Sequence, residues 1–195
     1  MDLLLATRNP HKTREFRELL GRDFQVKDLS LFPEIALPDE TGRTFEENAS
    51  LKAIAASRAQ QSWVIADDSG LEVDALGGAP GIYSARYAGE HASDRDNIDR
   101  LLGELRARNG KRSARFRCVI ALAKNGKLLG TFEGAAEGEI IDLAQGTSGF
   151  GYDPIFKPDG FEQTFGEMKP EQKNKISHRA KAIAALGDAL RQVEN

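Results

Sequence analysis

Apolar residues along the chain fall into short runs and into longer stretches where they recur every three or four positions. Short runs are typical of buried strands, and periodic stretches are typical of helices with one apolar face. The pattern predicts strands at residues 3–6, 64–66 and 71–73, and helices at residues 10–20, 44–61 and 94–108. A last helix, which Ser177 can cap, would bury Ile183, Leu186, Leu190 and Val193.

Residues 115–133 predict a β-hairpin, because two apolar stretches are separated by Asn125-Gly126, a dipeptide typical of tight two-residue turns. Helices between strands, together with one antiparallel hairpin, predict an α/β protein with a mixed sheet. The glycine-rich segments 77–81 and 146–151 would be loops on this sheet.

The composition narrows the class of protein. A chain of 195 residues that is 40% hydrophobic can bury a substantial core without disulfides or a structural metal. Its single cysteine, Cys118, fits a reducing compartment and alternates with apolar residues, so we expect a core position. The apolar run in residues 1–6 is too short for a signal peptide or a membrane span. A net charge of −3 argues against general nucleic-acid binding.

Two adjacent carboxylates and a hydroxyl, Asp67-Asp68-Ser69, follow the apolar run 64–66 and precede Gly70. Ligands in α/β sheets gather where strands end, and acidic oxygens there can hold Mg²⁺ against a polyphosphate. The segment therefore predicts a strand that ends in a metal or phosphate site. A solvated turn is the alternative, because Asp, Ser and Gly all favour turns.

A second candidate lies between the first strand and the first helix, at Thr7-Arg8-Asn9-Pro10-His11-Lys12. Pro10 suits the first helical position and Asn9 suits the cap, so we expect free backbone N–H groups to face the loop and bind an anion. Lys12 can turn back toward a phosphate. The alternative is an ordinary capped helix with a surface lysine.

The sequence excludes two common nucleotide-binding motifs, the P-loop and the glycine-rich loop of dinucleotide-binding folds. The chain has no Gly-x-x-x-x-Gly-Lys-Ser/Thr segment, and Gly149-Phe150-Gly151 lacks the third glycine and the preceding strand of a dinucleotide-binding fold.

A third candidate is the start of the helix at 44–61. Thr44 can cap it with Glu47 at the capping-box position, and Asn48 and Lys52 lie one turn apart on one face. Lys52 either reaches a phosphate or is solvated. Glu40, just upstream, adds a carboxylate.

Two further segments suit recognition of a base. The glycines around Phe150 leave its ring free to stack on a planar base, although the ring can equally fill the core. His178 and Arg179 can both donate to an oxygen, which would favour a 6-oxopurine over a 6-aminopurine. A surface His-Arg pair is the alternative.

Taken together, the chain resembles the inosine triphosphate pyrophosphatase family, whose members hydrolyse dITP, ITP and XTP to monophosphates. The resemblance runs nearly end to end. It is carried by six motifs in family order: Thr7 to Lys12, Thr44 to Ala49, Ala66 to Leu71, Gly77 to Arg86, Gly149 to Pro154 and Lys173 to Arg179.

The resemblance implies a role for each matching residue. The triphosphate would be held by Thr7, Arg8, Asn9, Pro10, His11, Lys12 and Lys52. Mg²⁺ would be bound by Glu40 and Asp68, with Glu47 as a second candidate ligand, and Asp68 would also be the general base. Ser69 would contact the substrate near the phosphates or sugar. The base would be recognised by Phe150, Gly151, Tyr152, Asp153, Lys173, His178 and Arg179.

The resemblance also implies an elongated mixed β-sheet flanked by helices, forming one domain over residues 1–195 with a cleft between two lobes. It implies a homodimer. The composition adds the expectation of a cytoplasmic protein that binds neither nucleic acid nor membrane. Arg8 stands where a smaller residue such as glycine is familiar in the family, so it would either alter phosphate contacts or face solvent. The alternatives are a Maf-type nucleotide pyrophosphatase with another base preference, a non-catalytic nucleotide-binding or sensor protein, and a set of ordinary caps and turns.

Overall fold

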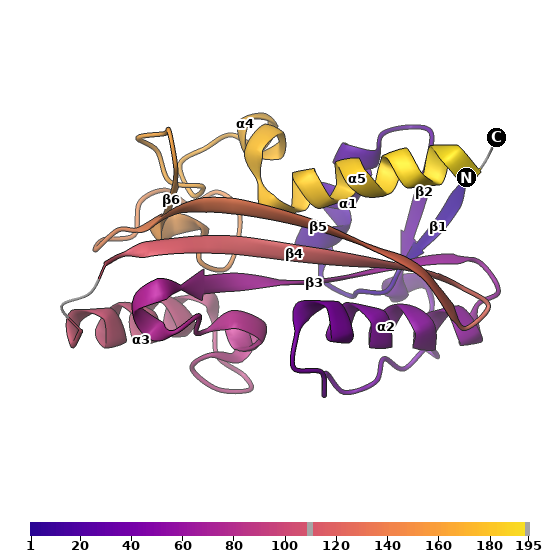
Figure 1. Cartoon of the computed structure of the whole chain (residues 1–195), viewed down its shortest axis with the longest axis horizontal. Helices are drawn as coiled ribbons and strands as arrows, with labels where there is room; N and C mark the ends of the chain where they lie inside the picture. Colours follow the sequence, from indigo (N-terminus) through magenta and orange to yellow (C-terminus); the bar gives the residue numbers. More distant parts are fainter. Residues whose placement is uncertain (109–110, 194–195) are drawn as a thin grey trace. The chain divides into compact units, whose positions relative to one another are not determined.

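The computed structural model describes residues 1–108 and 111–193, and within them a six-stranded sheet has the order β2-β1-β3-β4-β5-β6 (Figure 1). The strands are β1 (Asp2–Leu5), β2 (Gln25–Asp28), β3 (Trp63–Val73), β4 (Ser113–Lys124), β5 (Lys127–Ile140) and β6 (Phe156–Pro158). The α-helices are α1 (Pro10–Leu20), α2 (Phe45–Ala59), α3 (Asp94–Arg106), α4 (Pro170–Ile176) and α5 (His178–Val193). Short 3₁₀ helices are η1 (Leu29–Leu31), η2 (Asp74–Leu76), η3 (Gly81–Arg86) and η4 (Asp153–Ile155).

The sheet is mixed, as predicted. Strand β1 pairs in parallel with β2 and β3, whereas β5 pairs antiparallel with β6. The predicted hairpin is also confirmed: β4 and β5 are neighbours joined by Asn125 and Gly126, which have φ angles of 52° and 74°. Two successive residues with positive φ match the right-handed twist of the flanking strands. The chain therefore has the predicted α/β class with helices flanking a mixed sheet.

Strand β3 differs from the prediction. Instead of two short strands with a turn between them, it runs unbroken from Trp63 to Val73 and carries Asp67 and Asp68 in its middle. Both residues are buried, at 2% and 6% exposure, and both carboxylates contact buried cations. Those long-range contacts override the turn preference of Asp, Ser and Gly. The prediction that the strand ends at Ala66 is therefore wrong.

The chain divides into two compact units. Unit 1 comprises Met1–Asp68, Cys118–Gly134 and Arg179–Asn195, and unit 2 comprises Ser69–Arg117 and Ala135–His178. Strands β3, β4 and β5 each contribute residues to both units.

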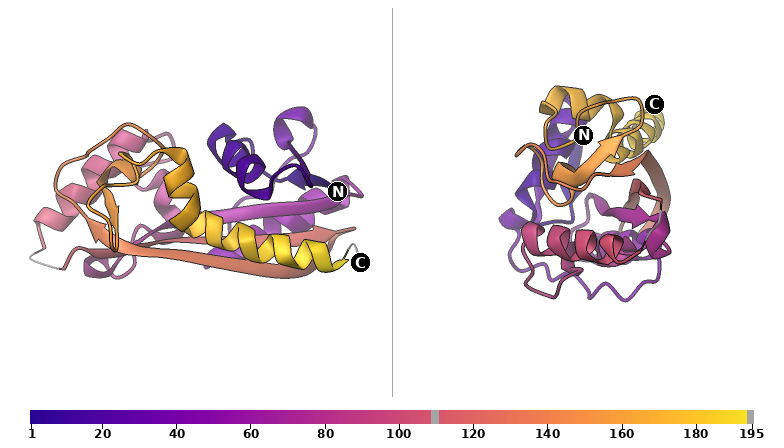
Figure 2. Two further views of the ribbon diagram at one scale, coloured as in Figure 1. Left: turned by 90° about the horizontal axis from the view of Figure 1, so that it is seen from above. Right: turned by 90° about the vertical axis from the view of Figure 1, so that its left-hand side faces the viewer.

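Unit 1 has three layers. Helices α1 and α5 lie on one face of its strands and α2 lies on the other (Figure 1). Seen from above, α5 runs along β4 and β5 (Figure 2). One core cluster joins the strands to α1 and α5 through side chains such as Leu5, Phe16 and Leu186, and it includes Cys118, as predicted. On the other face, small residues of α2, among them Ala53, are fully buried.

The core of unit 2 is aromatic. Phe116 on β4 packs edge-on against Phe156 on β6, with ring centroids 4.8 Å apart, and Phe165 completes the group. Leu101 and Leu105 bring α3 into the same cluster.

The predicted helix starts are close to those observed. Asn9 caps α1 with Pro10 at its first position, and the Thr44 hydroxyl accepts from the Glu47 N–H at the start of α2. Ser177 ends α4 and directly precedes α5, whose inward residues Ile183, Leu186 and Leu190 are buried; the side chain of Val193 lies outside the described residues. None of the helices in the described residues is long and apolar enough to cross a membrane.

Candidate functional site

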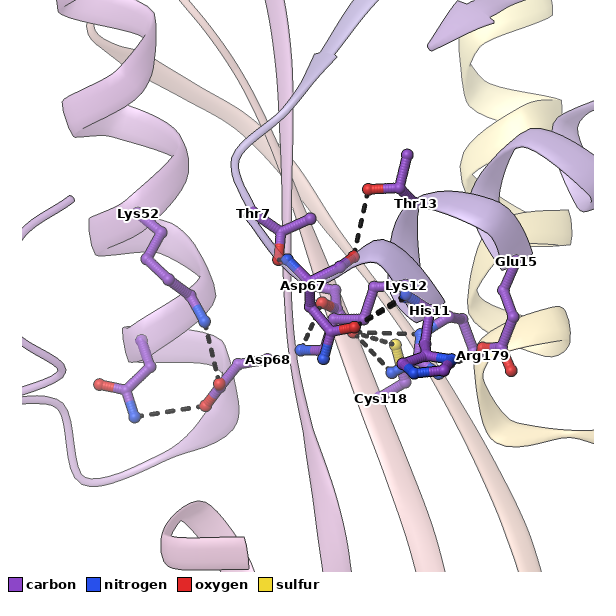
Figure 3. A network of polar contacts seen from close by, with 12 residues as sticks. Thr7, His11, Lys12, Thr13, Glu15, Lys52, Asp67, Asp68, Cys118 and Arg179 are labelled. Atoms are coloured by element: carbon purple, nitrogen blue, oxygen red, sulfur yellow. Dashed lines mark hydrogen bonds and ion pairs between the residues drawn. The ribbon is translucent and has the colours of Figure 1, made fainter. Parts of the chain in front are cut away.

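Two carboxylates of unit 1 converge on one lysine. Lys52 projects from α2, and its Nζ lies 3.0 Å from Oδ1 of Asp68 on β3 (Figure 3) and 2.8 Å from Oε1 of Glu40 in the loop before α2. The side chains of Lys52 and Asp68 are each only 9% exposed. Three of the predicted site residues, which are distant in the sequence, therefore meet around one buried positive charge.

Asn48 fixes this arrangement, and sequence reasoning did not assign it to the site. Its side chain is fully buried, accepts from the Gly42 N–H at 2.8 Å and donates to Asp68 Oδ2 at 3.3 Å. A Cβ atom on Gly42 would lie 2.5 Å from the Asn48 side-chain oxygen, so only glycine fits here. Asn48 thus links the loop that carries Glu40 to Asp68. Its position one turn before Lys52 on the same helix face was the available signal.

The charges of this group shift its proton equilibria. Burial raises the pKa of Asp68, and the negative charge of Glu40 adds to the effect, while the charge of Lys52 opposes it. Burial works to lower the pKa of Lys52, but the charges of Asp68 and Glu40 outweigh it and raise that pKa. Lys52 therefore remains an ammonium ion that neutralises these carboxylates.

The same group suits a hard divalent cation. Mg²⁺ typically binds through one or two carboxylates and completes its coordination with water and substrate phosphates. Glu40 and Asp68 supply two such oxygens at a point where a cation is already held. Glu47 instead accepts from the Arg43 N–H at 2.6 Å at the start of α2. Among the described residues, no group of three or more acidic, His or Cys side chains forms a metal cage.

A second buried network lies around Asp67. Its carboxylate lies 2.7 Å from Lys12 Nζ and 3.0 Å from an Nη of Arg179, and the other Nη of Arg179 lies 2.6 Å from Glu15 (Figure 3). Burial works to raise the pKa of Asp67, but the charges of Lys12 and Arg179 outweigh it and hold that pKa far below its usual range. Cys118 lies at the edge of this network, with its sulfur 3.8 Å from Asp67. Sequence reasoning placed Asp67 in the predicted metal or phosphate segment without a role of its own, and it did not assign Glu15 to the site.

The segment before α1 is an ordered cap. The Asn9 side-chain oxygen accepts from the N–H groups of His11 and Lys12 at 2.9 Å and 3.3 Å, and the Asn9 N–H donates to the Thr7 hydroxyl. The prediction that free backbone N–H groups face the loop is therefore wrong for His11 and Lys12. Arg8 is exposed, as the second of its two expectations has it, and its guanidinium also donates to the Ile35 carbonyl at 2.8 Å.

In unit 2, the loop around Phe150 is tied to α4. Asp153 is buried, accepts from the Phe150 N–H at 2.9 Å and lies 2.7 Å from Nζ of Lys173. The Lys173 Nζ also lies 5.3 Å from the centre of the Phe150 ring, within cation–π range. Gly149 has a φ of 78°, and a Cβ atom there would lie 1.9 Å from an Asp153 oxygen.

Two other predicted base-recognition residues of unit 2 are core residues. Tyr152 is 3% exposed, and its hydroxyl donates to the Ser84 carbonyl at 2.9 Å. His178 is 4% exposed and stacks on Phe116 with ring centroids 4.8 Å apart. Gly151 donates its N–H to Asp94, and Ser69 is half-buried on β3.

The predicted residues therefore form two groups. Unit 1 holds Lys12 and Arg179 around Asp67, and Glu40 and Lys52 around Asp68. Unit 2 holds Phe150, Asp153 and Lys173.

Comparisons with known proteins agree with the resemblance seen in the sequence. The dITP/XTP pyrophosphatase of Bacillus licheniformis is 48% identical over 196 aligned positions, which cover 98% of this chain and 98% of the relative. The protein of the same name from Bacillus subtilis is 47% identical over 191 positions, covering 97% and 96%.

Solved structures support the fold over the same length. A Ham1 protein from Coxiella burnetii superposes with a TM-score of 0.90 at 40% identity, covering 98% of this chain and 99% of that one. The Ham1 protein of Staphylococcus aureus gives a TM-score of 0.88 at 44% identity, with the same coverage. The model of the Ham1 family matches residues 3–189, so the chain belongs to the Ham1 family.

Proposed function

We propose that this protein hydrolyses the non-standard purine nucleoside triphosphates dITP, ITP and XTP to a monophosphate and pyrophosphate. Its relatives are named for the dITP/XTP pyrophosphatase activity at up to 48% identity over nearly the whole chain. The observation that carries the proposal is the convergence of Glu40 and Asp68 on Lys52, which gives a carboxylate pair with hard-cation chemistry beside a phosphate-binding ammonium. Such an enzyme removes these nucleotides before they enter DNA and RNA.

Lys12 and Lys52 are the cations that bind the triphosphate in this proposal. Each ammonium has three donors, and each pairs with carboxylates in the structure. Thr7 and Asn9, which order the loop before Lys12, add polar groups next to it. Arg8 acts indirectly, because its contact with Ile35 fixes the loop after η1.

The proposed cofactor is Mg²⁺, held by Glu40 and Asp68. When bound, it neutralises phosphate charge and acidifies a water molecule. Asp68 would accept a proton from the attacking water as the water oxygen forms a bond to the α-phosphorus, and the bond from the α-phosphorus to the bridging oxygen would break to release pyrophosphate. Asn48 keeps the second oxygen of Asp68 in place during this step.

The base is bound in this proposal by the group in unit 2. The half-exposed Phe150 offers a stacking surface between two glycines, and Lys173 supplies a donor for an oxygen on the base. A 6-amino group on adenine leaves such a donor unpaired, which costs about 1–3 kcal/mol, or roughly tenfold to a hundredfold in selectivity. The buried Tyr152 anchors this loop through its hydrogen bond to the Ser84 carbonyl, and His178 and Arg179 are proposed to contribute from the start of α5.

We further propose that the protein is a homodimer, as the family resemblance implies, and that it acts in the cytoplasm. Light scattering after size exclusion tests the first point, because a monomer of 21.3 kDa and a dimer differ twofold in mass.

The test of the function is pyrophosphate release from dITP, XTP, dGTP and dATP, each with and without Mg²⁺. We expect fast, Mg²⁺-dependent release from dITP and XTP and slow release from dATP. Equal turnover of dGTP would overturn the base-selectivity argument. No release from any of the four would favour a nucleotide-binding protein or a Maf-type enzyme instead.

A further inference from the structure

Asp67 lies next to the proposed general base, but it belongs to a different network. Successive side chains of a strand point to opposite faces of the sheet, so Asp67 faces α1 and α5 while Asp68 faces α2. The Asp67 side chain is fully buried, whereas the Lys12 side chain that it holds is 17% exposed. The carboxylate is therefore shielded from solvent, whereas part of the Lys12 side chain is accessible.

The two oxygens of Asp67 have different cationic partners. One oxygen, Oδ1, lies 2.7 Å from Lys12 Nζ, and the other, Oδ2, accepts from Nε and an Nη of Arg179 at 3.2 Å and 3.0 Å. Arg179 is in turn held at its far side by Glu15. Because Arg179 donates two hydrogen bonds to Oδ2, the orientation of the Asp67 carboxylate is fixed. The other oxygen, Oδ1, then sets the position of the Lys12 ammonium.

We propose that Asp67 is a positioning residue, whose carboxylate holds the Lys12 ammonium where it binds the phosphates of the substrate. An ammonium that pairs with one buried carboxylate still has two N–H groups for an anion. Without Asp67, the flexible four-carbon stem of Lys12 is free to adopt many rotamers. Phosphate binding must then order that side chain, and the entropy cost of doing so weakens the binding. The inference rests on the proposed function, because it assigns a role in triphosphate binding.

The test is a double-mutant cycle between Asp67→Asn and Lys12→Met. We expect Asp67→Asn to raise the KM for dITP about tenfold and to change kcat by less than about threefold, because a lost ground-state contact mainly affects binding. In the Lys12→Met background, the same Asp67→Asn change should leave KM nearly unaltered, since the group it positions is gone. A merely structural role would lower the melting temperature in both backgrounds and leave KM unaltered in both.

A matched control is Ser57→Ala, which removes the partner of the Gly126 N–H in the same unit and touches neither network. It should lower the melting temperature without changing KM. If Asp67→Asn does not fold, Asp67→Glu keeps the charge beside Arg179 but moves its oxygens, and the same cycle with Lys12→Met applies. An unchanged KM in a folded Asp67 variant, or an undiminished effect in the Lys12→Met background, overturns the proposal.

A second measurement separates this inference from the proposed function. Calorimetric binding of inorganic tripolyphosphate needs no turnover and no base. If the wild-type protein binds tripolyphosphate but hydrolyses no nucleotide, the proposed function fails. The double-mutant cycle between Asp67 and Lys12 is then measured as changes in the affinity for tripolyphosphate. If the wild-type protein hydrolyses dITP and the cycle shows no coupling, only the positioning role fails.

Discussion

Asp67 and Asp68 show how the environment of a single residue decides its chemistry. Asp67 lies between two cations, Lys12 and Arg179, which hold its pKa far below the usual value. Burial raises the pKa of Asp68, and the negative charge of Glu40 adds to this effect, while the charge of Lys52 opposes it. The first carboxylate is a fixed anion at all ordinary pH values, and the second is the one suited to exchange a proton.

Replacing Asp68 by Asn should abolish turnover while sparing the fold. We expect kcat for dITP to fall by about a thousandfold or more, because the proposed base is lost. The pKa of Asp68 is raised in the folded state, whereas it is about 3.9 in the unfolded state. Above that value, the ionised side chain lowers the free energy of unfolding. The neutral amide of the variant should therefore leave the melting temperature equal or higher. Pyrophosphate release and thermal melting measure the two effects.

Asp39 provides the control for this prediction. It is exposed and adjacent to Glu40, so Asp39→Asn should retain activity whereas Glu40→Gln should weaken Mg²⁺ binding, as measured by calorimetry. If Asp39→Asn weakened metal binding instead, the ligand would have to be reassigned to Asp39. Near wild-type turnover in Asp68→Asn would refute the assignment of the base.

Acid should remove the stabilisation that Asp67 provides. Its folded pKa is lowered, so its contribution is fully present above the unfolded pKa of about 3.9 and is lost as the pH falls below it. Asp67→Asn should therefore cost about 3–5 kcal/mol near neutral pH, because it removes one of the two carboxylates that pair with the buried Arg179 and leaves only Glu15 of that pair. Melting curves of both proteins from neutral to acidic pH should converge only below about pH 4. A gap that persists unchanged into strong acid would contradict this linkage.

At the scale of elements, the course of the Phe150 loop in unit 2 depends on its glycines. The loop at residues 148–154 turns through Gly149 and Gly151, which have φ angles of 78° and 60°. A Cβ atom added to Gly149 would overlap the Asp153 side chain, whereas a Cβ atom added to Gly151 would meet no atom within 4 Å. The first glycine is therefore needed for contact and conformation, and the second for conformation alone.

Gly149→Ala should therefore impair the enzyme more than Gly151→Ala. Both variants carry the strain of a positive φ, roughly 1–2 kcal/mol, but Gly149→Ala must also displace Asp153 and with it the partner of Lys173. We expect a KM for dITP at least about tenfold higher for Gly149→Ala, and a smaller increase for Gly151→Ala. Steady-state kinetics on both variants checks this, and equal effects would show that strain alone matters.

At the scale of the whole molecule, the chain crosses from one unit to the other within strands and a helix. The unit boundaries fall within β3, β4, β5 and α5 and not in linkers. Backbone hydrogen bonds of these elements continue through each boundary, so unfolding of one unit disrupts strands of the other. Residues 1–195 are therefore predicted to unfold as one domain.

The aromatic residues provide a test, because the two units carry different ones. The only tryptophan, Trp63, lies in unit 1, and the three tyrosines, Tyr83, Tyr87 and Tyr152, all lie in unit 2. We expect tryptophan fluorescence and tyrosine absorbance to give coincident urea transitions, as two-state unfolding requires. Transitions at separate urea concentrations would instead show that the units unfold independently. Trp63→Phe serves as the control that the fluorescence signal comes from unit 1.

The sequence by itself determined the local features of this protein. Asn9 and Pro10 define the start of α1, Thr44 defines the start of α2, and Asn125-Gly126 forces the hairpin turn. Each of these signals depends on the conformational preferences of a few neighbouring residues, which act in any context. Ordered motifs along the chain likewise indicated the family, and the comparisons confirmed it.

Only the tertiary structure decided the course of β3 and the partners of its acids. Asp67-Asp68-Ser69-Gly70 favours a turn locally, yet it forms a strand because its carboxylates meet buried cations. Arg179 lies 112 positions from Asp67 and 164 from Glu15, and Asn48 lies 20 positions from Asp68. Contacts at such separations depend on how helices and strands pack, and no local preference encodes them. The sequence thus identified which residues carry the chemistry, and packing decided which carboxylate holds which cation.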